Sequence, residues 1–121
     1  MRVKLIAGLA AFVIASPAMA MDVSAFLTKA DSLQRKGPFA LFSGDYKLLM
    51  GQIKADAQAL KADREAAKAA GRTAAYCPPG PIKMSAGDIM TAMRQVPVAE
   101  RARTDTRSAL RAYFARRFPC R

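Results

Sequence analysis

Apolar residues recur at helical spacing in four segments of this chain, and polar residues fill the positions between them. The first stripe comprises Val23, Phe26, Leu27, Ala30 and Leu33. These positions fall on one face of a helix, which predicts an amphipathic helix with a buried side. Asp22 or Ser24 can cap its start, because a short side-chain oxygen accepts from free amides of the first turn. Gly37-Pro38 should end the helix near Lys36.

The second stripe predicts the longest helix of the chain. It comprises Leu49, Ile53, Ala57 and Leu60. Asp45 is the expected N-terminal cap, and Gly71 is the expected C-terminal stop. Beyond Leu60 the segment is rich in alanine, lysine and glutamate, which have high helix propensity, but the apolar stripe thins. The pattern therefore leaves open whether the second half of this helix belongs to the core or projects as an arm.

Two shorter stripes follow, separated at Pro97. The third begins with Ser85-Ala86-Gly87-Asp88, which has the form of a capping box with aspartate at its last position, and continues through Ile89, Met90, Met93 and Val96. The fourth stripe comprises Ala102, Thr106, Ala109, Leu110, Tyr113 and Phe114. No segment alternates with the period of two that a half-buried strand requires. The sequence thus predicts a small all-α domain of four helices.

The first twenty residues have the pattern of a secretory signal peptide. Arg2 and Lys4 precede an apolar run over residues 5–15, and Ala18-Met19-Ala20 supplies the small residues of a cleavage site. The run is short for a membrane span, although an uncleaved N-terminal anchor is the alternative reading. We expect cleavage after Ala20, a single domain over residues 21–121, and a periplasmic location.

The chain has two cysteines, Cys77 and Cys120, and each stands next to a proline. Cysteines of exported proteins pair readily because their destination is oxidising, and two cysteines allow one intramolecular pairing. We expect a disulfide that ties the C-terminus to the central loop. A buried thiol or an intermolecular bond is the alternative.

The net charge of +11 is concentrated in the second half of the chain. Arg103, Arg107 and Arg111 step by four along the predicted last helix and should form one basic edge. Such an edge favours an acidic partner, and these three arginines are the candidate partner-binding residues. A solvated face that keeps the protein soluble is the alternative. The export signal and the lack of aromatic residues between the arginines argue against nucleic acid.

The residues that most enzymes use are scarce. The chain contains no histidine, and paired cysteines leave no free thiol. Its nine carboxylates are scattered singly and are expected on surface faces. We therefore expect no catalytic residue, metal site or cofactor, and a binding role rather than an enzyme.

The segment around the two cysteines contains a series of short motifs: Tyr76-Cys77-Pro78-Pro79, a predicted short helix from Ser85 to Pro97, Arg101, Ala109-Leu110 and Phe118-Pro119-Cys120. In their order and spacing these motifs resemble the C-terminal half of the Tai-type immunity proteins. Members of that family are periplasmic inhibitors of peptidoglycan amidases delivered by type VI secretion. The resemblance implies a small helical domain with a C-terminal disulfide, and a secreted peptidoglycan amidase as its protein partner.

The resemblance does not extend to residues 21–71, which lack the second cysteine pair found in many family members. The inhibitory surface of such proteins is specific to each effector. The resemblance therefore identifies no inhibitory residue in this chain. The alternative function is a chaperone-like or envelope-binding periplasmic protein. The basic second half and the seven methionines motivate that alternative, which predicts salt-sensitive peripheral contact with the anionic envelope.

Overall fold

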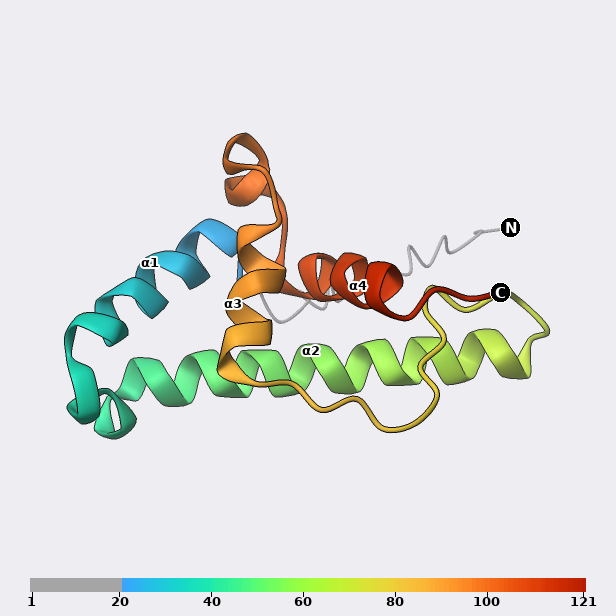
Figure 1. Ribbon diagram of the computed structural model, residues 1–121, viewed down its shortest axis with the longest axis horizontal. Helices are drawn as coiled ribbons and strands as arrows, with labels where there is room; N and C mark the ends of the chain where they lie inside the picture. Colours follow the sequence, from blue (N-terminus) through green and yellow to red (C-terminus); the bar gives the residue numbers. More distant parts are fainter. Residues whose placement is uncertain (1–20) are drawn as a thin grey trace, which may run out of the picture.

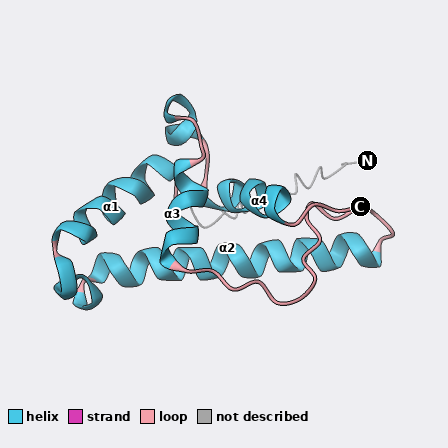
Figure 2. Cartoon of the chain, in the orientation of Figure 1, coloured by secondary structure: helices cyan, strands magenta, loops and turns pink. Residues whose placement is uncertain are grey.

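The computed structural model describes residues 21–121, so the predicted signal peptide lies outside the described residues. Four α-helices follow one another in this part of the chain: α1 (Val23–Arg35), α2 (Gly44–Ala69), α3 (Ala86–Arg94) and α4 (Thr106–Arg117). Two short 3-10 helices, η1 (Gly37–Phe42) and η2 (Val98–Arg103), connect them. The prediction of an all-α domain is confirmed, and residues 21–121 contain no strand beyond an isolated bridge between Asp22 and Asp105 (Figure 2).

Helix α1 has the expected boundaries. The Asp22 side chain accepts a hydrogen bond from the Ala25 amide at 2.8 Å, and the helix ends at Arg35. Gly37 then adopts a φ of +60°, a left-handed conformation that glycine enters without strain. The predicted apolar face is buried in full: Val23, Phe26, Leu27, Ala30 and Leu33.

Helix α2 is 26 residues long, which at 1.5 Å per residue corresponds to roughly 39 Å. Its cap is Ser43, whose hydroxyl accepts from the Asp45 amide, so the expected cap at Asp45 was wrong by two positions. Its end is a Schellman motif, in which the amides of Gly71 and Arg72 donate to the carbonyls of Lys68 and Ala67. Gly71 has a φ of +69°, as this motif requires.

The long helix belongs to the core over most of its length. Its buried residues are Leu49, Ile53, Asp56, Leu60 and Ala67. Figure 1 shows α2 running along one side of the molecule, with α1 and η1 against its first part and α4 against its second part. Helix α3 crosses between them and packs on α1 and α4. The second half of α2 therefore belongs to the core and does not project as an arm.

Helix α4 begins four residues later than its apolar stripe predicted. Residues 98–103 form η2, in which Ala102 is exposed, and Asp105 caps α4 by accepting from the Ser108 amide at 2.7 Å. The segment between η2 and α4 is extended because it pairs with the start of α1. The Val23 amide donates to the Thr104 carbonyl at 2.8 Å, and the Thr106 amide donates to the Met21 carbonyl at 2.9 Å.

Helix α3 carries the predicted capping box. The Ser85 hydroxyl accepts from the Asp88 amide, and the Asp88 carboxylate accepts from the Ser85 amide. These hydrogen bonds lower the pKa of Asp88, with the Ser85 backbone amide as the largest cause. The Tyr113 hydroxyl of α4 also donates to Asp88 at 3.2 Å, which joins the start of α3 to the last helix.

Candidate functional site

The three arginines proposed for partner binding do not share one helix edge. Arg103 lies in η2 and is exposed, whereas Arg107 and Arg111 lie in α4. Arg107 is partly buried, and its Nε lies 3.6 Å from an Asp56 carboxylate oxygen. Arg111 is exposed and lines a surface hollow. The helix break before Thr106 separates the first of these residues from the other two.

Asp56 is fully buried on α2, so the expectation that all carboxylates lie on surface faces was wrong. The Thr106 hydroxyl and the Gln52 amide nitrogen each donate a hydrogen bond to it, the second at 2.9 Å. With Arg107 these groups form a polar link between α2 and the start of α4. Arg107 thus has a structural role in the fold, because its charge partner is inside the protein.

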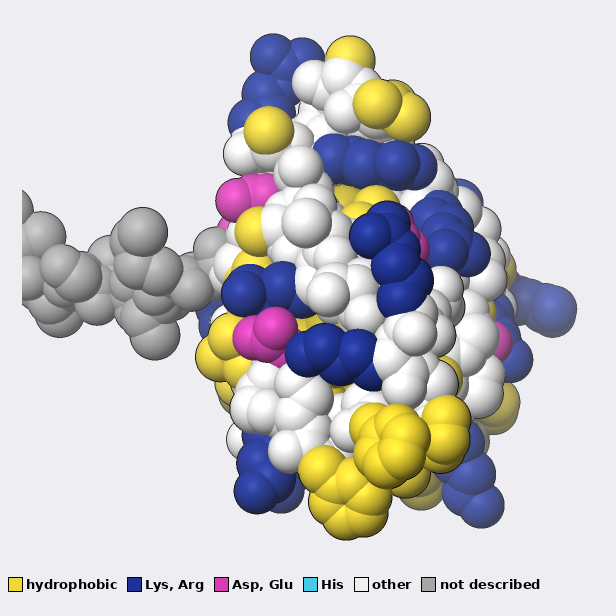
Figure 3. Space-filling model, turned by 90° about the vertical axis from the view of Figure 1, so that its left-hand side faces the viewer, with side chains coloured by type: hydrophobic (Ala, Val, Ile, Leu, Met, Phe, Trp, Pro, Cys, Tyr) yellow, Lys and Arg dark blue, Asp and Glu magenta, His cyan; other side chains and the backbone are white. Residues whose placement is uncertain are grey.

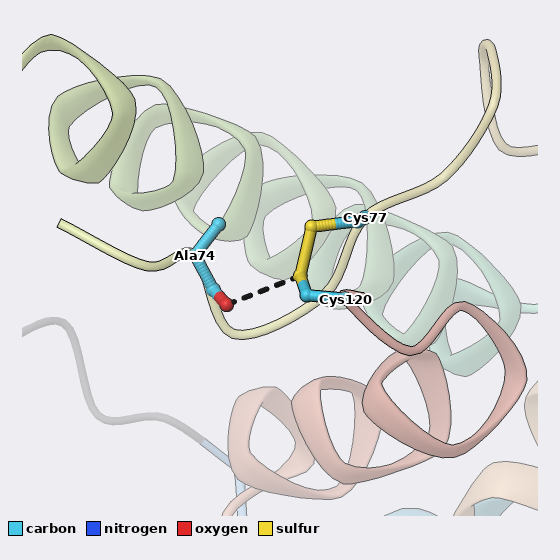
Figure 4. The surroundings of a disulfide bond; sticks show 3 residues. All are labelled: Ala74, Cys77 and Cys120. Atoms are coloured by element: carbon cyan, nitrogen blue, oxygen red, sulfur yellow. Dashed lines mark hydrogen bonds between the residues drawn. A yellow bond between two sulfur atoms is a disulfide. The ribbon is translucent and has the colours of Figure 1, made fainter. Parts of the chain in front are cut away.

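The predicted disulfide between Cys77 and Cys120 is confirmed, with the two Cα atoms 4.9 Å apart. It joins the loop after α2 to the segment after α4 (Figure 4). The Cys77 amide donates to the Phe118 carbonyl at 2.8 Å, and the Cys120 sulfur lies 3.3 Å from the Ala74 carbonyl oxygen. A disulfide sulfur has no proton to donate, so the approach of the Cys120 sulfur to the Ala74 carbonyl is a packing contact. Together these interactions fix the loop that carries Tyr76.

This loop, α2 and α4 enclose a half-open hollow of about 260 Å³, which we call the arginine hollow. Its arginines come from all three segments: Arg64 from α2, Arg72 from the loop and Arg111 from α4. The remaining lining residues are Leu60, Asp63, Ala67, Thr73, Ala75 and Tyr76. Asp63 is the one carboxylate among these residues. Within residues 21–121, none of the three arginines forms an ion pair with a carboxylate.

The wall of the hollow is fixed by aromatic packing. The Arg64 guanidinium lies over the Tyr76 ring, with its central carbon 5.3 Å from the ring centre. Tyr76 is buried against Phe114, at 5.1 Å between ring centres. Burial raises the pKa of Tyr76, with the Arg64 charge opposing this effect, so the phenol remains protonated at neutral pH. The Arg64 Nε is buried and has no hydrogen-bond partner in the described part of the chain.

This arrangement is suited to binding a carboxylate or another oxyanion. Guanidinium groups form charge-assisted, often bidentate hydrogen bonds with such groups, and an unpartnered buried N–H gains most from an acceptor. Over the described residues there is no group of three side chains that could hold a metal ion. The hollow could not be predicted from the sequence, because positions 64, 72 and 111 share no period and only the fold brings them together.

A second hollow, of about 230 Å³, lies between α3, η2 and α4. Arg116 is the basic residue that lines this hollow, and its guanidinium already donates a hydrogen bond to the Gln95 side-chain oxygen. Glu100 also lines it. The arginine hollow is therefore the stronger candidate for an acidic partner.

Comparisons with protein-family models, with characterised proteins and with solved structures find no significant match to the chain. Among the helices of residues 21–121, none has the length and apolar character needed to cross a membrane.

Proposed function

We propose that the protein is an exported immunity-type inhibitor that binds a cell-wall amidase and blocks it. The arginine hollow is the observation that carries this proposal: three guanidinium groups that have no carboxylate partner within residues 21–121 line one small concave surface. The resemblance of residues 77–120 to Tai-type proteins and the predicted signal peptide supply the class of partner and the compartment.

The inhibitory mechanism would be steric. Acidic side chains at the rim of the enzyme's substrate cleft pair with Arg72 and Arg111, and the body of the helical domain covers the cleft. The disulfide holds the Tyr76 loop in the binding conformation, so little ordering is required when the complex forms. Complementary charge of this kind raises the association rate and sets the orientation of the partner.

The first experiment is a pull-down from periplasmic extract with the purified exported protein, followed by mass spectrometry after a high-salt wash. The proposal predicts that one cell-wall hydrolase is retained and that its activity falls when the protein is added. Retention of no hydrolase, with a broad set of proteins lost at moderate salt, would contradict the proposal and indicate the chaperone-like or envelope-binding alternative.

Charge reversal then tests the hollow itself. Arg72→Glu and Arg111→Glu should each slow association with the retained hydrolase at low salt, by about tenfold or more. Arg103→Glu is the matched control, because it makes the same charge change at an exposed arginine outside the hollow. Equal effects of all three substitutions would indicate that net charge, and not the hollow, governs binding.

A further inference from the structure

Three large apolar side chains protrude from η1, at the end of the molecule where α1 turns into α2. Phe39 is 76% exposed, Leu41 59% and Phe42 85%. Leu48 and Met50, near the start of α2, are also exposed. We call Phe39, Leu41 and Phe42 the apolar tip. An apolar group of this size is comparable to the largest patch on a typical soluble protein, and such patches often mark a binding site.

The backbone of the tip is held in place. Gly37 supplies the left-handed turn, and Pro38 restricts the first turn of η1. Ala40, between the exposed residues, packs against the core, and the Ser43 amide donates to its carbonyl at 3.0 Å. The structure therefore directs Phe39 and Phe42 outward while Ala40 anchors the segment, so their exposure does not come from a frayed loop.

Basic side chains surround the tip. Arg35 and Lys36 stand at the end of α1, and Lys47 stands in the first turns of α2. Figure 3 shows the apolar group at the lower end of the molecule with basic side chains on both sides. The sequence has no acidic residue from 32 to 44, and the carboxylate that follows, Asp45, is paired with Lys29 at 3.6 Å.

We propose that the apolar tip inserts into the surface of an anionic lipid membrane, with Arg35, Lys36 and Lys47 at the headgroups. Aromatic and aliphatic side chains flanked by lysine and arginine are the combination that peripheral proteins use at anionic bilayers. Protein interfaces are instead depleted in lysine. The three side chains expose on the order of 400 Å², about half of what one partner buries in a standard protein interface.

The tip and the arginine hollow lie toward opposite ends of α2, at residues 37–42 and near residues 60–67 (Figure 1). A molecule that docks through the tip therefore leaves the hollow away from the membrane. The membrane contact is independent of the proposed amidase inhibition, and each can fail without the other.

The chain contains no tryptophan, so Phe42→Trp introduces a single fluorescent reporter at the tip. The exported protein carrying this substitution is mixed with vesicles of phosphatidylcholine containing one-third phosphatidylglycerol. We expect its emission to shift to shorter wavelength and to be quenched by bromine-labelled acyl chains. Val98→Trp is the matched control, because Val98 is 77% exposed on η2 and should show no shift.

Two results would overturn the proposal. One is unchanged Phe42→Trp emission with the anionic vesicles. The other is a shift without vesicles that grows with protein concentration, which would mean that a second copy covers the tip. The fluorescence reports the surroundings of position 42 alone. Attachment of the chain to vesicles through an uncleaved N-terminal segment would therefore not by itself produce the expected shift and quenching.

Binding measurements separate the two components of the contact. Phe39→Ser combined with Phe42→Ser should lower the vesicle partition coefficient by tenfold or more. Arg35→Gln, Lys36→Gln and Lys47→Gln should each lower it about fivefold, and only for the anionic vesicles. Lys61→Gln, an exposed charge in the second half of α2, is the control and should have little effect. Undiminished binding by the double serine variant would contradict insertion of the tip.

Discussion

Replacing Asp56 with alanine should lower the free energy of unfolding by about 3 kcal/mol. The Asp56 carboxylate is fully buried between α2 and α4. It accepts from the Thr106 hydroxyl and the Gln52 amide, and Arg107 lies 3.6 Å away. The substitution removes the acceptor of two hydrogen bonds and the partner of one ion pair. It also leaves a space that the neighbouring helices cannot close without moving.

The magnitude follows from how each donor responds. Thr106 is fully buried, so its hydroxyl loses its partner without gaining water, at about 1–3 kcal/mol. The hydrogen bond from half-buried Gln52 contributes about 0.5–1 kcal/mol. The Nε of Arg107 is buried, but the side chain as a whole is 40% exposed and that exposed part stays hydrated. The loss of this ion pair is therefore nearer the ~1 kcal/mol of a surface pair than the 3–5 kcal/mol of a fully buried one.

Urea denaturation of the oxidised protein measures this effect through the transition midpoint and slope. Asp31→Ala is the matched control, because Asp31 pairs with Arg94 at 3.7 Å and both side chains are half exposed. This substitution should change the free energy of unfolding by less than about 1 kcal/mol. A double-mutant cycle with Thr106→Ala should show a coupling of at least about 1 kcal/mol. If Asp56→Ala is no more destabilising than Asp31→Ala, the inferred role of the buried network is wrong.

Three further predictions concern the disulfide, the glycines of α2 and the capping box. Reduction of the bond between Cys77 and Cys120, which are 43 positions apart, should destabilise the domain by ~4 kcal/mol in the chain-entropy model, and thermal unfolding with and without reductant measures this. Gly51→Ala should stabilise by about 1 kcal/mol, because Gly51 lies inside α2 with open space at the new Cβ position, whereas Gly71→Ala should destabilise by a similar amount because its φ is +69°; equal effects of the two substitutions would contradict the Schellman assignment. The lowered pKa of Asp88 means that the capping box favours the folded state above the ordinary value of 3.8, and that this contribution is lost as the pH falls through the lowered pKa. An NMR titration of the Asp88 carboxyl should show this lowered pKa. Ser85→Ala removes the hydroxyl but keeps the backbone amide, so it should return the pKa only part of the way toward 3.8.

Most of the secondary structure could be predicted because its signals are local. The caps at Asp22 and Ser85 bind amides three residues away, and the stops at Gly37 and Gly71 depend on the conformation of one residue. The buried face of α1 follows from its period alone. The disulfide could also be predicted, because two cysteines in a chain that is expected to be exported leave one intramolecular pairing.

The start of α4 could not be predicted from its stripe. Periodicity placed Ala102 on the helix, but backbone pairing with Met21 and Val23, about eighty positions away, holds the preceding residues extended. A local pattern carries no information about such a distant partner.

The candidate binding surfaces were decided by tertiary structure for the same reason. The sequence determined the four helices, the caps of α1 and α3, and the covalent link. It could not show that Asp56 is buried, because its partner Thr106 is 50 positions away, nor that Arg107 turns inward while Arg111 faces a hollow. Charge and exposure depend on which distant residues the fold brings together, and the arginine hollow and the apolar tip exist only once the helices have packed.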